Sequence, residues 1–307
     1  MVTYVLSVPT RQLADDLSDL PGDVEVTVWD MTVPAPRKRI DIVVPPYSSK
    51  SEVLAQLEGV DAGLIQSQSI GYEGVADLLP DGHVFANASS VHETSTAELA
   101  VALTLASQRH LPEFVHSQDR GAWEPVLSES LADRRVLLLG YGGVGKAIAA
   151  RLRPFEVSLA AVASRAREEE GMPVHALDEL PALLPETDIV VASLPGGDAT
   201  WHIVDDAFLA ALPDGALVVN VGRGGLIDTD ALVRHASAGR IRAALDVTDP
   251  EPLPAHHPLW SVPGVLIVPH VGGASSAMRP RIATLVRTQV ERMLAGEEPL
   301  NVVLDKR

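Results

Sequence analysis

Three titratable side chains, Arg223, Glu251 and His270, follow apolar runs in the second half of this 307-residue sequence. Such runs predict buried strands, and the carboxyl ends of parallel strands lie at one edge of a sheet. A guanidinium can hold a substrate carboxylate with two hydrogen bonds, and an imidazolium can give a proton to a carbonyl oxygen as hydride arrives. A neighbouring carboxylate orients the imidazole and raises its pKa. Singly, each residue also fits a structural role; together they predict a site that reduces an oxoacid.

A glycine pattern, G-x-G-x-x-G, lies upstream of these residues, between an apolar run and a helical run. In a dinucleotide-binding turn, Gly140 permits the tight turn, Gly142 lets the backbone approach a pyrophosphate, and Gly145 lets the helix pack on the strand. Gly143 and Val144 complete the start of the helix, whose N-terminus faces the negative charge. The pattern predicts a nucleotide site, because the strand and the helix are both present.

Apolar runs alternate with helical stretches along the whole chain, which predicts parallel sheets. The fold class is therefore α/β. We predict a doubly wound Rossmann sheet in residues 103–284, inserted into a smaller flavodoxin-like α/β substrate domain formed by residues 1–102 and 285–307. The strands are expected at 4–8, 24–29, 40–44, 63–66 and 84–87 in the first domain, and at 136–139, 159–163, 188–193, 216–221, 241–246 and 265–268 in the second. A long helix at 278–294 and an apolar tail are expected to return to the first domain, whereas residues 110–133 are expected to be an irregular arm.

Composition excludes several classes of function. The net charge of −17 argues against a nucleic-acid or anionic-membrane surface, because such surfaces are basic. With no cysteine there is no disulfide or thiolate metal site, and the ten histidines show no metal-binding spacing, so we expect no metal. No apolar run approaches the ~18 residues of a membrane helix and no leader is evident, so a cytoplasmic protein is expected.

Four motifs resemble, in order and spacing, those of the D-isomer-specific 2-hydroxyacid dehydrogenases. The resemblance covers nearly the whole chain. The motifs lie at residues 140–145, 220–226, 245–252 and 268–273.

The resemblance implies roles for single residues. Arg223 would bind the carboxylate and carbonyl of a 2-oxoacid, His270 would be the acid in reduction, and Glu251 would be its partner. Asp246 would lie near the nicotinamide carboxamide. Further cofactor contacts are implied at Leu194, Pro195, Val221, Gly222 and Gly272.

The substrate domain would contribute two loops at the carboxyl ends of its strands. By the same resemblance, backbone amides of Ser69, Ile70 and Gly71 would cradle the substrate carboxylate. Tyr47 and Ser48 would help to select the substrate side chain. From the residues alone, both loops could also be ordinary polar turns.

The end of the second strand of the nucleotide domain lacks the acid that usually binds the ribose 2′-hydroxyl of NAD. The chain instead has Ser164, Arg165 and Arg167, and a hydroxyl followed by guanidinium groups suits a 2′-phosphate. NADP(H) is therefore the predicted cofactor, with NAD(H) as the alternative; otherwise the arginines are solvated at a helix start. The stretch is similar to that of glyoxylate and hydroxypyruvate reductases, although glycines at 196 and 197 depart from the family pattern.

The predicted function is NADPH-dependent reduction of a small 2-oxoacid, such as glyoxylate or hydroxypyruvate, to the D-2-hydroxyacid in a cleft that closes. The resemblance also implies a homodimer through the nucleotide domain and an arm at about 104–135. One alternative is a nucleotide-sensing protein like the family's corepressors, without turnover. Another is phosphite-type oxidation; formate oxidation is disfavoured because Val268, not Gln, precedes Pro269 and His270.

Overall fold

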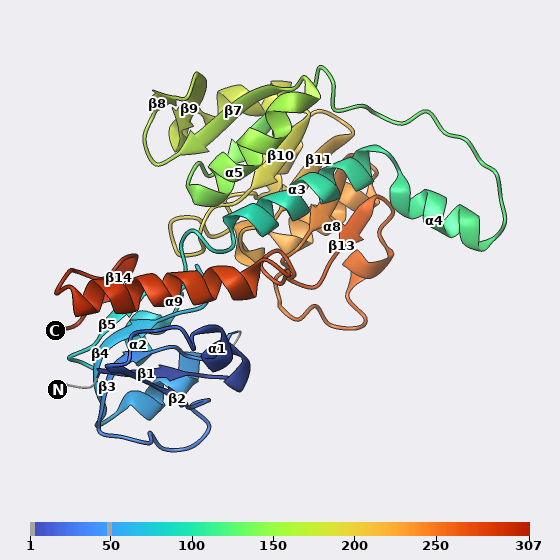
Figure 1. Cartoon of the computed structure of the whole chain (residues 1–307). Coiled ribbons are helices and arrows are strands. Elements are labelled where there is room, and N and C mark those ends of the chain that lie inside the picture. The colour runs from blue at the N-terminus through green and yellow to red at the C-terminus, as the bar shows by residue number, and fades with distance from the viewer. Residues whose placement is uncertain (1–3, 48–50) are drawn as a thin grey trace. The chain divides into compact units, whose positions relative to one another are not determined.

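The computed structural model describes residues 4–47 and 51–307, and the chain divides into two compact units (Figure 1). Unit 1 comprises Met1–His92 and Ser276–Arg307, and unit 2 comprises Glu93–Ser275. These boundaries differ from the predicted ones, because the helix α3 (Glu93–Gln108) lies wholly in unit 2. Its apolar face, including Ala100 and Leu103, is buried in the core of that unit, which leaves no break within the helix.

Unit 1 contains a six-stranded sheet in the order β14-β5-β4-β3-β1-β2. Strands β1 to β5 are parallel to one another and lie in flavodoxin-like order, whereas β14 is antiparallel to β5. The strands are β1 (Tyr4–Val8), β2 (Val24–Val28), β3 (Arg39–Val43), β4 (Asp61–Gln66), β5 (Val84–Ala86) and β14 (Val302–Asp305). The helical segments are α1 (Arg11–Asp16), η1 (Ser51–Leu57), α2 (Val75–Leu78) and α9 (Met278–Leu294). Ile282, Val286 and Val290 of α9 enter the core with Leu6 and Ile42, so the predicted return of the C-terminal segment is confirmed.

Unit 2 contains an eight-stranded sheet in the order β13-β12-β11-β10-β6-β7-β9-β8, which is the doubly wound order about β6. The strands are β6 (Arg135–Leu139), β7 (Ser158–Ala163), β8 (Arg167–Glu169), β9 (Met172–Ala176), β10 (Ile189–Ala192), β11 (Ala216–Asn220), β12 (Ile241–Leu245) and β13 (Val265–Ile267). The helices are α3, α4 (Leu111–Asp119), α5 (Gly143–Leu152), α6 (Leu180–Leu183), α7 (Asp206–Ala211) and α8 (Thr229–Ser237). The predicted fold class is confirmed. The antiparallel pair β8–β9 was not predicted.

Apolar side chains cover both faces of the unit 2 sheet, as expected for parallel strands. Leu137 and Leu139 point into one core cluster, whereas Val136 and Leu138 point into the other. The carboxyl end of β6 is therefore held firmly from both faces, and the turn that follows it is fixed in place.

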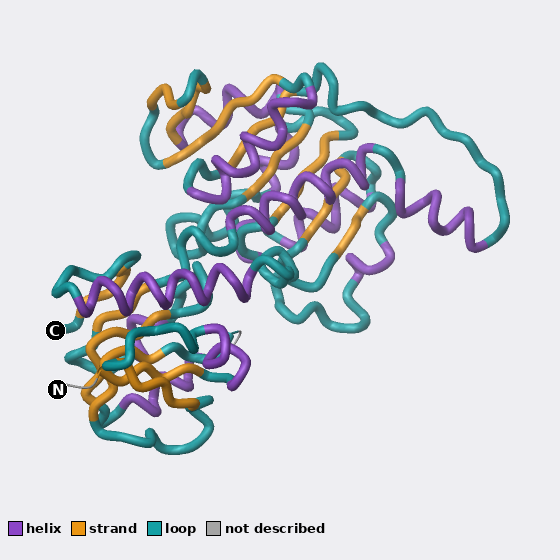
Figure 2. The backbone as a smooth tube through the Cα atoms, in the orientation of Figure 1, coloured by secondary structure: helices purple, strands orange, loops and turns teal. Residues whose placement is uncertain are grey.

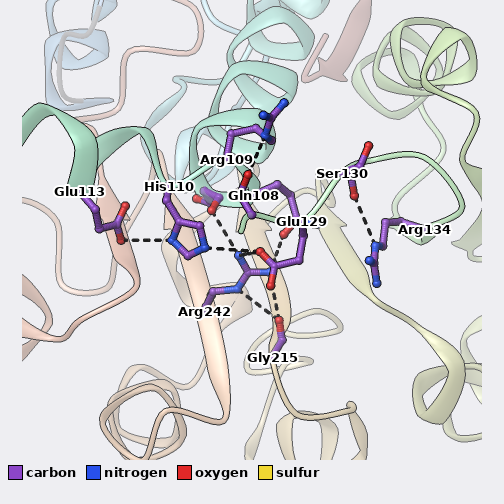
Figure 3. A network of polar contacts seen from close by, with 11 residues as sticks. Gln108, Arg109, His110, Glu113, Glu129, Ser130, Arg134, Gly215 and Arg242 are labelled. Carbon is purple, nitrogen blue, oxygen red and sulfur yellow. Dashed lines mark hydrogen bonds and ion pairs between the residues drawn. The ribbon is translucent and has the colours of Figure 1, made fainter. Parts of the chain in front are cut away.

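Residues 109–130 form an extension of unit 2 that includes α4, and Figure 2 shows it reaching away from the sheet. Its ends meet at Arg242 of β12, which donates to Gln108 Oε1 and to the carbonyl of Gly215 (Figure 3). Arg242 Nη1 also lies 3.6 Å from Glu129 Oε2, and His110 Nε2 lies 3.5 Å from the same oxygen. The expectation of a wholly irregular arm was wrong, because α4 is helical.

Candidate functional site

The glycine turn between β6 and α5 has the shape that a dinucleotide requires. Gly140 has a φ of +105°, and a Cβ there would lie 3.0 Å from the Leu194 nitrogen. A Cβ at Gly145 would lie 2.1 Å from the carbonyl oxygen of Gly140, so only glycine allows the helix to pack this closely. A Cβ at Gly142 would meet nothing within 4 Å, so the backbone is open on that side.

The first amides of α5 are available to an anion. Gly142 is the N-cap and supplies no side-chain hydrogen bond. The amides of Gly143 and Val144 have no acceptor among the described residues. Because the N-terminus of a helix carries a partial positive charge, these residues fit the pyrophosphate of a dinucleotide.

The residues after β7 differ in how they are held. Ser164 and Arg165 are exposed, and the Arg165 guanidinium has no polar partner in the part of the chain that the structure describes. Arg167 instead donates to Glu169 Oε2 at 2.8 Å and to the carbonyl of Arg165 at 3.2 Å. Glu169 also pairs with Lys146. The alternative of a helix start at this point was wrong, because Arg167 opens the strand β8.

His270 and Glu251 form a close pair. His270 Nδ1 lies 2.6 Å from Glu251 Oε1, and the other ring nitrogen has no partner within residues 4–47 and 51–307. The hydrogen bond to Glu251 raises the pKa of His270 above its ordinary value, although partial burial opposes this. The same hydrogen bond lowers the pKa of Glu251. The pair can hold a proton on the imidazole and present Nε2 to a substrate oxygen.

Arg223 lies in the turn after β11. The side chain of Asn220 fixes this turn, because its Nδ2 donates to the Arg223 carbonyl at 2.8 Å and its Oδ1 accepts from the Gly222 amide at 3.0 Å. The hydrogen bond between Glu251 and His270 is the main cause of both pKa shifts. The positive charge of Arg223 adds to the lowering of the Glu251 pKa and opposes the raising of the His270 pKa, so Arg223 lies within electrostatic range of both residues.

Asp246 lies at the end of β12 and is buried, with 3% of its surface exposed. Its Oδ1 accepts from the Val271 amide at 2.6 Å and its Oδ2 from the Gly272 amide at 3.0 Å. Burial raises the pKa of Asp246, and the two amides counteract only part of this effect. In the structure Asp246 therefore positions the turn that carries His270.

The remaining predicted cofactor residues line the same edge of the sheet. A Cβ at Gly222 would lie 2.7 Å from the Leu194 carbonyl oxygen, and one at Gly272 would lie 2.8 Å from Asp246 Oδ2. The Val221 amide donates to the carbonyl of Ala192, at the end of β10. The carbonyl of Pro195 accepts from Thr200 Oγ1 at 2.7 Å, which closes the loop after β10.

In unit 1 the two predicted substrate loops lie at the carboxyl ends of the strands. The ring of Tyr47 stacks on His92, with ring centroids 5.7 Å apart, whereas Ser48 lies outside the described residues. The amide of Ser69 already donates to Ser67 Oγ at 3.0 Å. The amides of Ile70 and Gly71 have no acceptor in the described ranges, and they fit a carboxylate better than Ser69 does.

The described residues include neither a candidate metal site nor a candidate membrane span. Residues 4–47 and 51–307 contain no group of three His, Cys, Asp or Glu side chains that could hold a metal ion. No described helix is both long and apolar enough to cross a membrane.

Sequence reasoning missed several side chains around the site. Asn220 belongs to a motif, but its two hydrogen bonds depend on the turn geometry. The ring of Trp201 packs on Gly225, and a Cβ at Gly225 would lie 2.4 Å from that ring. Tyr141 is buried beneath Lys146 and Arg167, each 5.9 Å from the ring centre. Asn220 and Tyr141 each lie within a motif, which was their one signal in the sequence, whereas Trp201 lies outside the four motifs.

Comparisons with known proteins agree on one family. Residues 101–272 match the model of the D-isomer specific 2-hydroxyacid dehydrogenase, NAD binding domain. The chain is 30% identical to the glyoxylate reductase/hydroxypyruvate reductase of Homo sapiens, over 90% of each protein. It is 29% identical to the glyoxylate reductase of Pyrococcus horikoshii, over 96% of this chain and 94% of the relative.

A solved structure extends the likeness to three dimensions. The NADPH-dependent glyoxylate/hydroxypyruvate reductase of Sinorhizobium meliloti, in complex with NADP and malonate, aligns with a TM-score of 0.80 at 27% identity. The alignment covers 100% of this chain and 98% of that one.

Proposed function

Because the chain belongs to the D-isomer-specific 2-hydroxyacid dehydrogenase family, we propose that it reduces a small 2-oxoacid to the D-2-hydroxyacid with NADPH. The chain is an oxidoreductase that uses a nicotinamide dinucleotide, as its family does. The single observation that carries the proposal is the His270–Glu251 pair at 2.6 Å, beside Arg223 and in the same unit as the glycine turn.

In the proposed reaction, the hydride that reduces the carbonyl carbon would come from NADPH held at the glycine turn. His270 donates a proton from Nε2 to the carbonyl oxygen, and Glu251 stabilises the imidazolium before the transfer. Arg223 binds the carboxylate and polarises the carbonyl, and Asn220 keeps the Arg223 turn in place. In the reverse direction, His270 would accept the proton from the hydroxyl group.

The preference for NADPH is proposed from the residues after β7. Arg165 is exposed and has no polar partner among the described residues, so it is available to a 2′-phosphate, with Ser164 as a hydroxyl donor. Arg167 is already paired with Glu169, and we assign it a smaller role. No carboxylate occupies the position at which an NAD enzyme would bind the 2′-hydroxyl.

Glyoxylate and hydroxypyruvate are the proposed substrates, because relatives that align over nine-tenths of the chain are named for them. The amides of Ile70 and Gly71 would bind the carboxylate of the oxoacid. Tyr47, which stacks on His92, would limit the size of the substrate side chain.

We also propose a homodimer through the extension of unit 2. Trp123 is 97% exposed and Leu127 is 100% exposed, a solvent exposure that self-association would relieve. Substituting both by Ser should convert a dimer into a monomer in analytical ultracentrifugation. The same substitutions at the exposed Val33 and Leu78 of unit 1 provide a control that should leave the dimer intact.

The test of the function is the initial rate of NADPH and NADH oxidation with glyoxylate, hydroxypyruvate, pyruvate and phenylpyruvate. Faster turnover of the small oxoacids with NADPH supports the proposal. NADPH binding without turnover of any oxoacid would contradict it and favour a nucleotide-sensing protein. Reduction of NADP by phosphite, measured in parallel, would favour the phosphite reaction.

A further inference from the structure

Glu93, the first residue of α3 and of unit 2, places a carboxylate against the glycine turn. A Cβ at Gly143 would lie 3.0 Å from Glu93 Cγ and 3.1 Å from its Oε1. The side chain is partly buried, and its Oε2 is shielded from solvent. The absence of a side chain at Gly143 therefore leaves room for the Glu93 side chain.

The place that Glu93 takes is next to the amides that fit a pyrophosphate. Gly143 and Val144 open the ten-residue helix α5 without a side-chain cap. A carboxylate near this end is stabilised by the helix dipole while no other anion is present. A pyrophosphate on the same amides would be repelled by it, because both groups are negative.

We infer that Glu93 competes with the pyrophosphate of the cofactor for the N-terminus of α5. The carboxylate stabilises the glycine turn in the free chain and weakens dinucleotide binding until the side chain moves away. The inference rests on the proposed function only in that the dinucleotide binds at the glycine turn. It does not depend on which oxoacid is reduced.

The expected effect is the same for both nicotinamide cofactors, because NADPH and NADH share the pyrophosphate. Repulsion between two unit charges about 5 Å apart, in a medium with an effective dielectric constant of about 40, weakens binding roughly tenfold. By contrast, Arg165 should act on the 2′-phosphate of NADPH alone. The effect of Glu93 can therefore be separated from that of Arg165 by measuring the affinities for both NADPH and NADH.

The experiment compares Glu93→Gln with Glu98→Gln, which removes the same charge from an exposed position of the same helix. Dissociation constants of NADPH and NADH are measured by fluorescence titration without oxoacid. Glu93→Gln should bind both cofactors about tenfold more tightly, and Glu98→Gln should bind them as the natural chain does. Unchanged constants in Glu93→Gln, an effect on NADPH alone, or an equal effect in Glu98→Gln would overturn the inference.

A second measurement tests the contact in the free protein. Gly143→Ala should change the melting temperature less favourably in the natural chain than in a Glu93→Ala background, because only in the natural chain does the added methyl group meet Glu93 Cγ. Equal changes in the two backgrounds would refute the contact. If the natural chain binds both cofactors but reduces no oxoacid, the proposed function is refuted, whereas the inference about Glu93 is not.

Discussion

Replacing Asp246 by Ala should destabilise unit 2, because two backbone amides would lose their acceptor. The Val271 and Gly272 amides donate to this carboxylate at 2.6 and 3.0 Å, and Asp246 is 3% exposed. An unsatisfied buried donor costs about 1–3 kcal/mol, which gives about 2–6 kcal/mol for the pair. Removing a buried charge offsets part of that, and the Val271 bond is only partly buried, so we expect a loss of about 2–4 kcal/mol.

The assay is the free energy of unfolding from urea denaturation at neutral pH. Asp246→Asn is the matched variant, because it retains one acceptor oxygen and should lose roughly half as much free energy. Both variants should also lower turnover, since the turn they loosen carries His270. A loss below about 1 kcal/mol in Asp246→Ala would refute the assignment of Asp246 as the residue that holds this turn.

The difference in unfolding free energy between the natural chain and Asp246→Asn should change with pH in one definite direction. Burial raises the pKa of Asp246 in the folded chain above the ordinary 3.8, so the folded state binds this proton more tightly than the unfolded state. Relative to Asp246→Asn, the natural chain should therefore become more stable as the pH falls through the raised pKa. The gain should level off below 3.8. A relative stability that falls over this interval would contradict the assignment.

Three further predictions concern the proposed chemistry. His270→Asn should lower the turnover number for oxoacid reduction about 100- to 10,000-fold while leaving NADPH binding intact, and unchanged turnover would exclude His270 as the acid. In Glu251→Gln the fall in turnover with rising pH should begin at lower pH, because Glu251 raises the pKa of His270; an unchanged pH profile would count against the pair. Arg165→Ala should weaken NADPH binding about 10- to 100-fold more than NADH binding, and Arg167→Ala should do so less, as measured by titration; equal effects on both cofactors would disprove a phosphate contact.

Much of the fold could be predicted because its main signals are local. The strands β6, β10, β11 and β12 consist mainly of apolar residues, and a parallel sheet places their carboxyl ends together. The meeting of Arg223, Glu251 and His270 follows from that rule, and their shared effects on pKa agree with it. The role of each residue in turnover stays a prediction.

Other features depend on contacts between distant residues. The strand β8 is Arg-Glu-Glu and has no apolar residue, so no alternation of apolar and polar residues marks it in the sequence. Glu93 lies fifty positions before Gly143, and nothing in either local sequence indicates that they touch. The amide of Ser69 was predicted to bind substrate, yet a neighbouring hydroxyl already engages it. Such details depend on packing, which local sequence patterns do not encode.

The most direct test of the central claim is to identify the product formed from hydroxypyruvate and NADPH by chiral chromatography. One D-2-hydroxyacid should form for each NADPH consumed, and almost none should form with the His270→Asn chain. The L-enantiomer, or no product from a chain that binds NADPH, would contradict the proposed reaction.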